Sequence, residues 1–358
     1  MLYRPFGKTG KNISIISFGG MRFSEPENLD KSADCLLYAQ EKGINYFDTA
    51  PIYCEDRSED IFGHAFRQLP RDSFYVSSKC GQAKGEDLRK SLERSLRRLG
   101  IEQIDFLYIW HLMNPADWEE RKRGGAIEAA LQAKQEGLIG HLLCSSHMEG
   151  EGLSKVLDEE IFEGVLLGYN AINFPYRQAA VAQAGKQGIG VVTMNPLGGG
   201  LIPQNPQRFA FLKTATADNV VSGALQFNLS HPDITTALVG FANTQEIDQA
   251  TGAVDNFTPY NKKQRRELQK NLKTSFADLC TGCSYCLPCP VNIPIPQYLD
   301  SYNQLILTDG NQQAVLNRYK MHWNITPQQA KECIACGACE ERCTQHLPII
   351  QRLAELPE

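Results

Sequence analysis

The sequence of 358 residues predicts an α/β fold in which a (β/α)8 TIM barrel is followed by a small, mainly α-helical domain. Three observations support this prediction. Short β-rich apolar runs alternate with longer stretches of helical pattern, these runs number eight, and cysteines are concentrated in the last part of the chain. Eight strands with intervening helices in about 255 residues match the size of a closed barrel.

The expected strands are short apolar runs rich in β-branched and aromatic residues. They comprise residues 13–18, 44–48, 74–79, 105–110, 140–146, 164–169, 190–194 and 235–240. Between them, leucines recur at helical spacing, as Leu88, Leu92 and Leu96 do. Glycine often precedes the next strand, which suits the end of a helix. An open doubly wound sheet is the alternative, but no GxGxxG motif follows the first strand.

The bulk composition excludes several classes of function. The formal net charge of −5 argues against general nucleic-acid binding. No apolar run approaches the roughly 18 residues of a membrane-spanning helix, and residues 1–10 lack the apolar core of a signal peptide. We therefore expect a cytoplasmic protein without a membrane partner. Eight of the 12 cysteines fall in the last 79 residues, and in a reducing compartment this density indicates metal rather than disulfides.

The pattern changes before the dense cysteines begin. Residues 257–279 read as a helical segment with many basic side chains, which are Lys262, Lys263, Arg265, Arg266, Lys270 and Lys273. We expect a solvated linker helix, with a docking surface for an acidic electron-transfer partner as the alternative. The expected domains are residues 1–256 for the barrel, 257–279 for the linker and 280–358 for the cysteine-rich domain.

Two cysteine runs follow this linker. They read Cys280-x2-Cys283-x2-Cys286-x2-Cys289-Pro290 and Cys333-x2-Cys336-x2-Cys339-x3-Cys343. Three thiolates at such spacing can wrap three corners of one iron–sulfur cube, and the fourth ligand then comes from elsewhere. A pair of structural zinc sites is the alternative, but zinc requires only two CxxC hooks per site. The spacing therefore predicts a ferredoxin-like domain with two [4Fe–4S] clusters.

The fourth ligand of each cluster follows a known pattern. In bacterial two-cluster ferredoxins the last cysteine of each run serves the other cluster. We therefore expect one cluster on Cys280, Cys283, Cys286 and Cys343, and the second on Cys333, Cys336, Cys339 and Cys289. Two features depart from the usual ferredoxin pattern: only two residues precede the last cysteine of the first run, and Thr344 follows Cys343 in place of a proline. The identity of the fourth ligand of each cluster therefore stays open. The long gap between the runs favours the helical type of ferredoxin.

Several polar residues fall at the ends of the second, third and fourth expected strands, where barrel enzymes place their active sites. They are Asp48, Tyr53, Lys79 and His111. A lysine beside the tyrosine is expected to lower the phenol pKa from about 10, and a carboxylate holds that lysine charged. Singly, each residue has an ordinary structural role as a cap, ion pair or rim histidine. Together they predict proton donation to an oxygen as hydride arrives at the adjacent carbon.

These residues lie in segments that resemble the aldo/keto reductases. The segments are YRPFGKTGKNISIISFGGMRF, NYFDTAPIY, SSKCG and DFLYIWH, and the tail is similar to that of a branch with a C-terminal ferredoxin-type domain. The resemblance implies an oxidoreductase that interconverts a small carbonyl compound and an alcohol. It implies Tyr53 as the proton donor, with Asp48, Lys79 and His111 completing the tetrad. It also implies NADH or NADPH bound across the barrel mouth without a Rossmann fold.

The same resemblance implies a set of cofactor contacts. They are Gly20, Met21, Ser145, Ser146, Met194, Asn195, Pro196, Leu197, Gly198, Gly240, Asn243 and Thr244. Leu166 stands where a glutamine is usual, Asn195 replaces a lysine, and Ala250 replaces an asparagine. The loop after the last strand begins without Lys or Arg, so a 2′-phosphate would lack a charge-assisted partner. This pattern counts against a preference for NADP.

Hydride chemistry moves electrons in pairs, whereas a [4Fe–4S] cluster moves them singly. We therefore expect the clusters to relay electrons to or from a partner such as ferredoxin or flavodoxin. The alternative is an iron–sulfur electron-transfer or redox-sensing protein whose barrel has lost NAD(P)H-dependent chemistry. Cys54, Cys80 and Cys144 are expected to be small buried hydrophobes, and His147 is a candidate for the substrate pocket.

Overall fold

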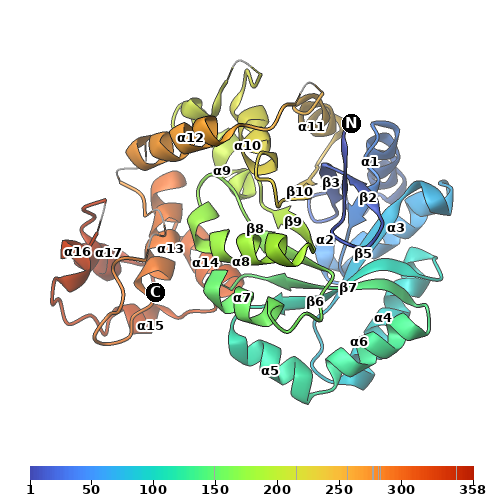
Figure 1. Ribbon diagram of the computed structural model, residues 1–358, viewed down its shortest axis with the longest axis horizontal. Coiled ribbons are helices and arrows are strands. Elements are labelled where there is room, and N and C mark those ends of the chain that lie inside the picture. The colour runs from blue at the N-terminus through green and yellow to red at the C-terminus, as the bar shows by residue number, and fades with distance from the viewer. Residues whose placement is uncertain are drawn as a thin grey trace.

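The parallel strands of the chain close into a barrel (Figure 1). The computed structural model describes residues 1–148, 150–214, 216–255, 257–275, 278–280, 282, 284–343 and 345–358. The barrel strands are β3 (Ile16–Gly19), β4 (Tyr46–Asp48), β5 (Tyr75–Cys80), β6 (Ile104–Leu112), β7 (Ile139–Ser146), β8 (Gly164–Gly168), β9 (Gly190–Met194) and β10 (Thr236–Gly240). Each strand pairs with its neighbours in sequence, and β10 pairs with β3. The TIM barrel is therefore confirmed, and the open sheet is excluded.

The prediction of a single first strand over residues 13–18 is wrong. The structure divides it between β2 (Asn12–Ser14), which forms an antiparallel hairpin with β1 (Tyr3–Pro5), and β3 of the barrel. The apolar run looks continuous because both pieces are buried. Ile13 joins Phe6 in a cluster with the barrel-interior Phe106, so the hairpin closes one end of the barrel.

Helices surround the barrel, and the longer ones bury their apolar faces against it. They are α1 (Leu29–Glu41), α2 (Tyr53–Asp56), α3 (Ser58–Phe66), α4 (Gly85–Leu99), α5 (Pro115–Arg123), α6 (Ala126–Gln135), α7 (Gly150–Leu157), α8 (Phe174–Gln187), α9 (Leu201–Gln204), α10 (Val220–Leu229) and α11 (Thr244–Gly252). In α4, Leu88, Leu92, Leu96 and Leu99 are buried as their helical spacing predicts. The helix ends where Gly100 adopts the left-handed conformation.

The C-terminal region is helical and has its own apolar core. Its helices are α13 (Ile295–Leu307), α14 (Gln312–Arg318), α15 (Pro327–Ala330), α16 (Ala338–Glu341) and α17 (Ile349–Glu355), with a π-helical turn over Tyr319–Trp323. Tyr298, Val315 and Leu353 belong to that core, together with Cys339 and Cys343. Figure 1 shows these helices gathered at one side of the barrel. The mainly helical character agrees with the prediction.

The junction between the two parts is packed onto the barrel. The basic segment forms α12 (Lys262–Ser275), from which Leu268 is buried in the main barrel core. Leu279 and Leu307 belong to the same core. The predicted linker helix is therefore attached along one face, and the exact domain boundaries stay a prediction. Among the described helices, none has the length and apolar character needed to cross a membrane.

Candidate active site and cysteine centres

A buried ion pair lies at the C-terminal ends of β4 and β5. Lys79 Nζ donates to Asp48 Oδ1 at 2.5 Å and to the Thr49 carbonyl at 2.8 Å. Ser77 Oγ donates to the other carboxylate oxygen of Asp48 at 2.6 Å. Burial opposes the charge on Lys79, but Asp48 and Tyr53 outweigh it and raise the lysine pKa. The lysine is therefore charged and oriented.

Tyr53 begins α2 directly after this pair. Its ring centroid lies 4.8 Å from Lys79 Nζ and 6.0 Å from the Trp110 ring, which meets it edge-on. Burial raises the Tyr53 pKa, while Lys79 opposes the rise, and the net direction is upward. Lys79 therefore lowers the phenol pKa as expected from the sequence, but burial outweighs this effect and the net pKa is raised. At neutral pH the phenol holds its proton and is available as an acid.

The backbone after Tyr53 is unusual. Cys54, Glu55 and Asp56 all have positive φ values, of 53°, 55° and 65°. Consecutive left-handed residues other than glycine require support from their surroundings. Arg98 supplies it, because its guanidinium contacts the Asp56 carboxylate at 2.6 Å and the Asp56 carbonyl. The turn that presents Tyr53 is thus held from α4.

His111 lies on the next strand, where a register shift interrupts the pairing of β6 with β7. Its backbone has a φ of 68°, and its N–H donates to Ser145 Oγ at 3.1 Å. Burial lowers the His111 pKa, so the ring is neutral at pH 7. The four predicted catalytic residues therefore occupy three consecutive strand ends, as their spacing requires.

A groove lies between the loops after β3, β9 and β10. Of the predicted contacts, Asn195, Pro196, Leu197 and Gly240 line it. It is also lined by Arg22, Phe241, Ala242, Glu246, Gln249 and Ala250. Arg22 is the single positive charge among the described residues of its lining. A Cβ added to Gly240 would lie 2.6 Å from Arg22 Cγ, so glycine lets the arginine cross this loop.

The other predicted cofactor residues are not among those that line the groove. Gly20 binds the Asp48 carbonyl through its N–H, Met21 is exposed, and Met194 and Gly198 flank the β9 loop. Asn243 caps α11 and Thr244 is its first residue. Ser145 accepts from His111, and the buried Ser146 Oγ donates to the Leu112 carbonyl. Leu166 packs in the barrel interior and offers an apolar surface in place of an amide.

The cysteine runs come together in two hollows of the C-terminal domain. One is lined by Cys289, Cys333, Cys336 and Cys339, together with Cys286 and apolar residues such as Ile293 and Leu353. The other is lined by Cys280, Cys286 and Cys343. Cys283 lies outside the described residues. Thiols from both runs that share apolar hollows fit the ligand sets of two iron–sulfur clusters.

Family comparisons agree with this architecture. The model described as "Aldo/keto reductase family" matches residues 15–273, and that described as "4Fe-4S dicluster domain" matches residues 279–348.

The chain belongs to the aldo/keto reductase family.

Similar curated proteins of this family carry oxidoreductase names. L-galactose dehydrogenase of Arabidopsis thaliana is 27% identical over an alignment of 282 residues, and the match covers 70% of this chain and 87% of that protein. The NADH-specific methylglyoxal reductase of Escherichia coli is 32% identical over 133 residues, 30% of this chain and 40% of that protein. An aldo-keto reductase from Bacillus halodurans in its holo form has a TM-score of 0.66 at 22% identity, over 75% of this chain and 96% of that one, and shares the fold.

This aldo/keto reductase also has a histidine pair that the sequence did not reveal. Nδ1 of His147 lies 3.0 Å from Nδ1 of His322, and the His147 ring centroid lies 5.1 Å from that of His111. Burial lowers the pKa values of His147 and His322 well below 6.5, so one neutral ring donates to the other. His322 belongs to the C-terminal domain, and no spacing rule connects residues so far apart in sequence.

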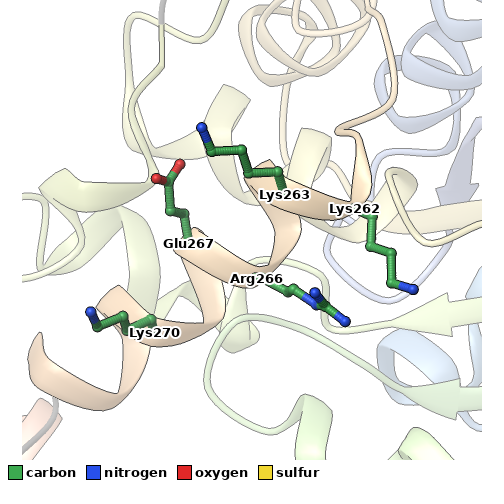
Figure 2. Close-up of a pocket in the computed structure, with 5 residues that line it drawn as sticks. All are labelled: Lys262, Lys263, Arg266, Glu267 and Lys270. Atoms are coloured by element: carbon green, nitrogen blue, oxygen red, sulfur yellow. The ribbon is translucent and has the colours of Figure 1, made fainter.

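The remaining cysteines and the basic helix add little to the catalytic site. Cys80 and Cys144 are buried as expected, whereas Cys54 is half-buried beside Tyr53. On α12, exposed charged side chains line a shallow hollow, and Figure 2 shows them projecting from the helix. They are Lys262, Lys263, Arg266, Glu267 and Lys270. This exposed face suits the predicted solvated helix, and docking of an acidic partner stays the alternative.

Proposed function

We propose that this aldo/keto reductase reduces a small carbonyl compound to an alcohol, or catalyses the reverse reaction, at the barrel mouth. The observation that carries the proposal is the buried Lys79–Asp48 pair beneath Tyr53. In the reduction, bound NADH or NADPH supplies hydride to the carbonyl carbon. Tyr53 donates its phenolic proton to the carbonyl oxygen, Lys79 stabilises the phenolate that remains, and neutral His111 orients the substrate.

The groove favours NADH over NADPH. Arg22 can face the pyrophosphate that both nucleotides share. The 2′-phosphate on the adenosine ribose, which only NADPH carries, would lie near the start of α11. Glu246 lines the groove there and accepts a hydrogen bond from the Ala242 N–H at 2.9 Å. A carboxylate at this place repels phosphate and can accept from a ribose hydroxyl.

Adding a cation to the groove is expected to change this preference. Gln249→Arg places a charge on the exposed groove face of α11 and should tighten NADPH binding by about tenfold, the effect of roughly 1.4 kcal/mol. NADH affinity should change little. Fluorescence titration with both nucleotides measures the two dissociation constants. Gln351→Arg, which adds the same charge on α17, serves as the control and should leave both constants unchanged.

The C-terminal domain is proposed to hold two [4Fe–4S] clusters. Cys280, Cys283, Cys286 and Cys343 would hold one, and Cys289, Cys333, Cys336 and Cys339 the other. The arrangement of two shared hollows, each lined by cysteines of both runs, supports this assignment. Such clusters pass single electrons to or from a carrier of the ferredoxin or flavodoxin kind.

Leu166 favours a second candidate function. Without an amide at that position, the nicotinamide ring would lose a hydrogen-bond partner. In that case the barrel binds a ligand without hydride transfer, and the chain acts as an iron–sulfur electron-transfer or redox-sensing protein.

One experiment separates the two candidates. The full chain, purified anaerobically, is titrated with NADH and with NADPH and is then supplied with small aldehydes and ketones. Saturable binding followed by NADH oxidation and alcohol formation supports the reductase. Clusters visible by EPR, with neither nucleotide bound, would instead support the electron-transfer protein.

The perturbed pKa values also predict how reduction depends on pH. The His111 pKa is lowered and the Tyr53 pKa is raised. His111 is therefore neutral above about pH 6.5, and Tyr53 stays protonated up to at least about pH 10. Carbonyl turnover under saturating substrate should be flat between these values and fall as Tyr53 loses its proton. An inflection near pH 8 would contradict the assignment.

A further inference from the structure

The barrel and the C-terminal domain meet at an aromatic contact that the proposed reaction does not use. Trp323 ends the π-helical turn and packs on α8, where its ring centroid is 5.4 Å from that of Tyr176. The guanidinium carbon of Arg177 lies 4.8 Å from the same indole ring. Trp323 Nε1 donates to the buried Asp300 carboxylate at 2.7 Å, which fixes the orientation of the indole.

Tyr176 reaches from this contact into the first cysteine run. Its hydroxyl oxygen lies 3.4 Å from Cys280 Sγ and 3.1 Å from the Pro296 carbonyl oxygen. Its ring lies directly against Gly282, because a Cβ added there would be 2.3 Å from a ring carbon. Gly282 also has a φ of 66°, which favours glycine. Gly282 of the first cysteine run is thus packed against a side chain of the barrel.

The other side of the contact reaches the barrel mouth. Arg177 Nη2 donates to the His147 carbonyl at 2.7 Å. The His147 ring in turn contacts His111 of the proposed tetrad, as described above. A series of contacts therefore connects His111 with Cys280. It runs through His147, whose backbone carbonyl binds Arg177, and then through Trp323 and Tyr176. In the hollow lined by Cys289, Cys333, Cys336 and Cys339, Cys336 is exposed.

We propose that Tyr176 is a positioning residue for the cluster held at Cys280, and that its hydrogen bond raises the reduction potential of this cluster relative to the other one. The inference rests on the proposed pair of clusters. A thiolate bound to iron has no proton to give, so the Tyr176 hydroxyl is the donor and shares its hydrogen between Cys280 Sγ and the Pro296 carbonyl. Hydrogen bonds to ligand sulfurs stabilise the more negative, reduced state and raise the reduction potential.

Tyr176→Phe removes this hydroxyl and keeps the ring against Gly282 and Trp323. The reduction potential of one cluster should become more negative, by roughly a tenfold change in its reduction equilibrium, which is 59 mV for one electron. The other cluster should keep its potential. An anaerobic redox titration of the full chain, followed by EPR, measures both. Cys280→Ser alters the signal of its own cluster and so identifies which of the two has shifted.

Tyr302→Phe is the matched control. It removes the hydroxyl of a tyrosine in the C-terminal domain, and this hydroxyl bonds to Glu355. It should leave both potentials unchanged. Two loaded clusters with unchanged potentials in Tyr176→Phe would overturn the inference, as would a shift confined to the cluster that Cys280→Ser leaves intact. A wild-type chain reconstituted with iron and sulfide that forms fewer than two clusters would refute the proposed function instead, so the two failures are distinguishable.

Discussion

Tyr53→Phe is expected to lower the rate of carbonyl reduction by about 10²- to 10⁴-fold, the usual contribution of general acid catalysis. The substitution removes the proton donor and leaves the aromatic ring beside Trp110. NADH should bind with unchanged affinity, because the hydroxyl is needed only when charge develops on the substrate oxygen. Single-turnover rates and NADH titration measure the two effects separately.

Tyr75→Phe is a suitable control for this substitution. Tyr75 begins β5, so it lies at the opposite end of the same strand from Lys79. Removal of the Tyr75 hydroxyl should leave the rate of carbonyl reduction unchanged. Full turnover of an identified carbonyl substrate by Tyr53→Phe would remove Tyr53 as the acid, whatever the effect of the control.

Lys79→Met is expected to destabilise the barrel by about 3–5 kcal/mol as well as to abolish most activity. Asp48 and Lys79 are each only 1% exposed, so the substitution leaves a buried carboxylate without its counter-charge. Ser77 would still donate to Asp48, but a neutral hydroxyl compensates only part of the lost interaction. The midpoint of chemical unfolding, followed by tryptophan fluorescence, measures the loss.

The double variant Lys79→Met/Asp48→Asn separates stability from catalysis. It removes the uncompensated charge and should recover part of the lost unfolding free energy. Activity should stay low, because no ammonium remains to stabilise the Tyr53 phenolate. If Lys79→Met alone were as stable as the wild type, Asp48 would not be charged in the folded barrel.

The sequence supported the prediction of the barrel and the tetrad because both depend on regular spacing. Asp48, Lys79 and His111 are separated by about one strand and one helix each, so they must share one rim of a (β/α)8 barrel. The cysteine runs were readable for the same reason, since the geometry of a cluster constrains the number of residues between its ligands. Which cysteine completes each cluster stays a prediction, because Cys283 lies outside the described residues.

Features that depend on burial or on distant packing could not be predicted in this way. Lys79 next to Tyr53 suggested a lowered phenol pKa, but only the folded chain shows how strongly burial opposes it. Residues 13–18 looked like one strand because both the hairpin and the barrel bury apolar side chains. The approach of His322 to His147 depends on how the C-terminal domain packs against α8, and no local pattern records it.

The packing of Leu279 and Leu307 into the barrel core has a consequence for the maturation of the protein. Asn205 Nδ2 also donates to the Leu307 carbonyl at 3.1 Å, and the Tyr176 ring lies against Gly282. The barrel therefore contacts the C-terminal domain directly, at Gly282 of the first cysteine run and at Leu307. Insertion of iron and sulfide should follow folding of the barrel, and an excised C-terminal fragment should assemble its clusters poorly. The fusion of the two parts is then a requirement of assembly as well as a means of bringing two redox sites together.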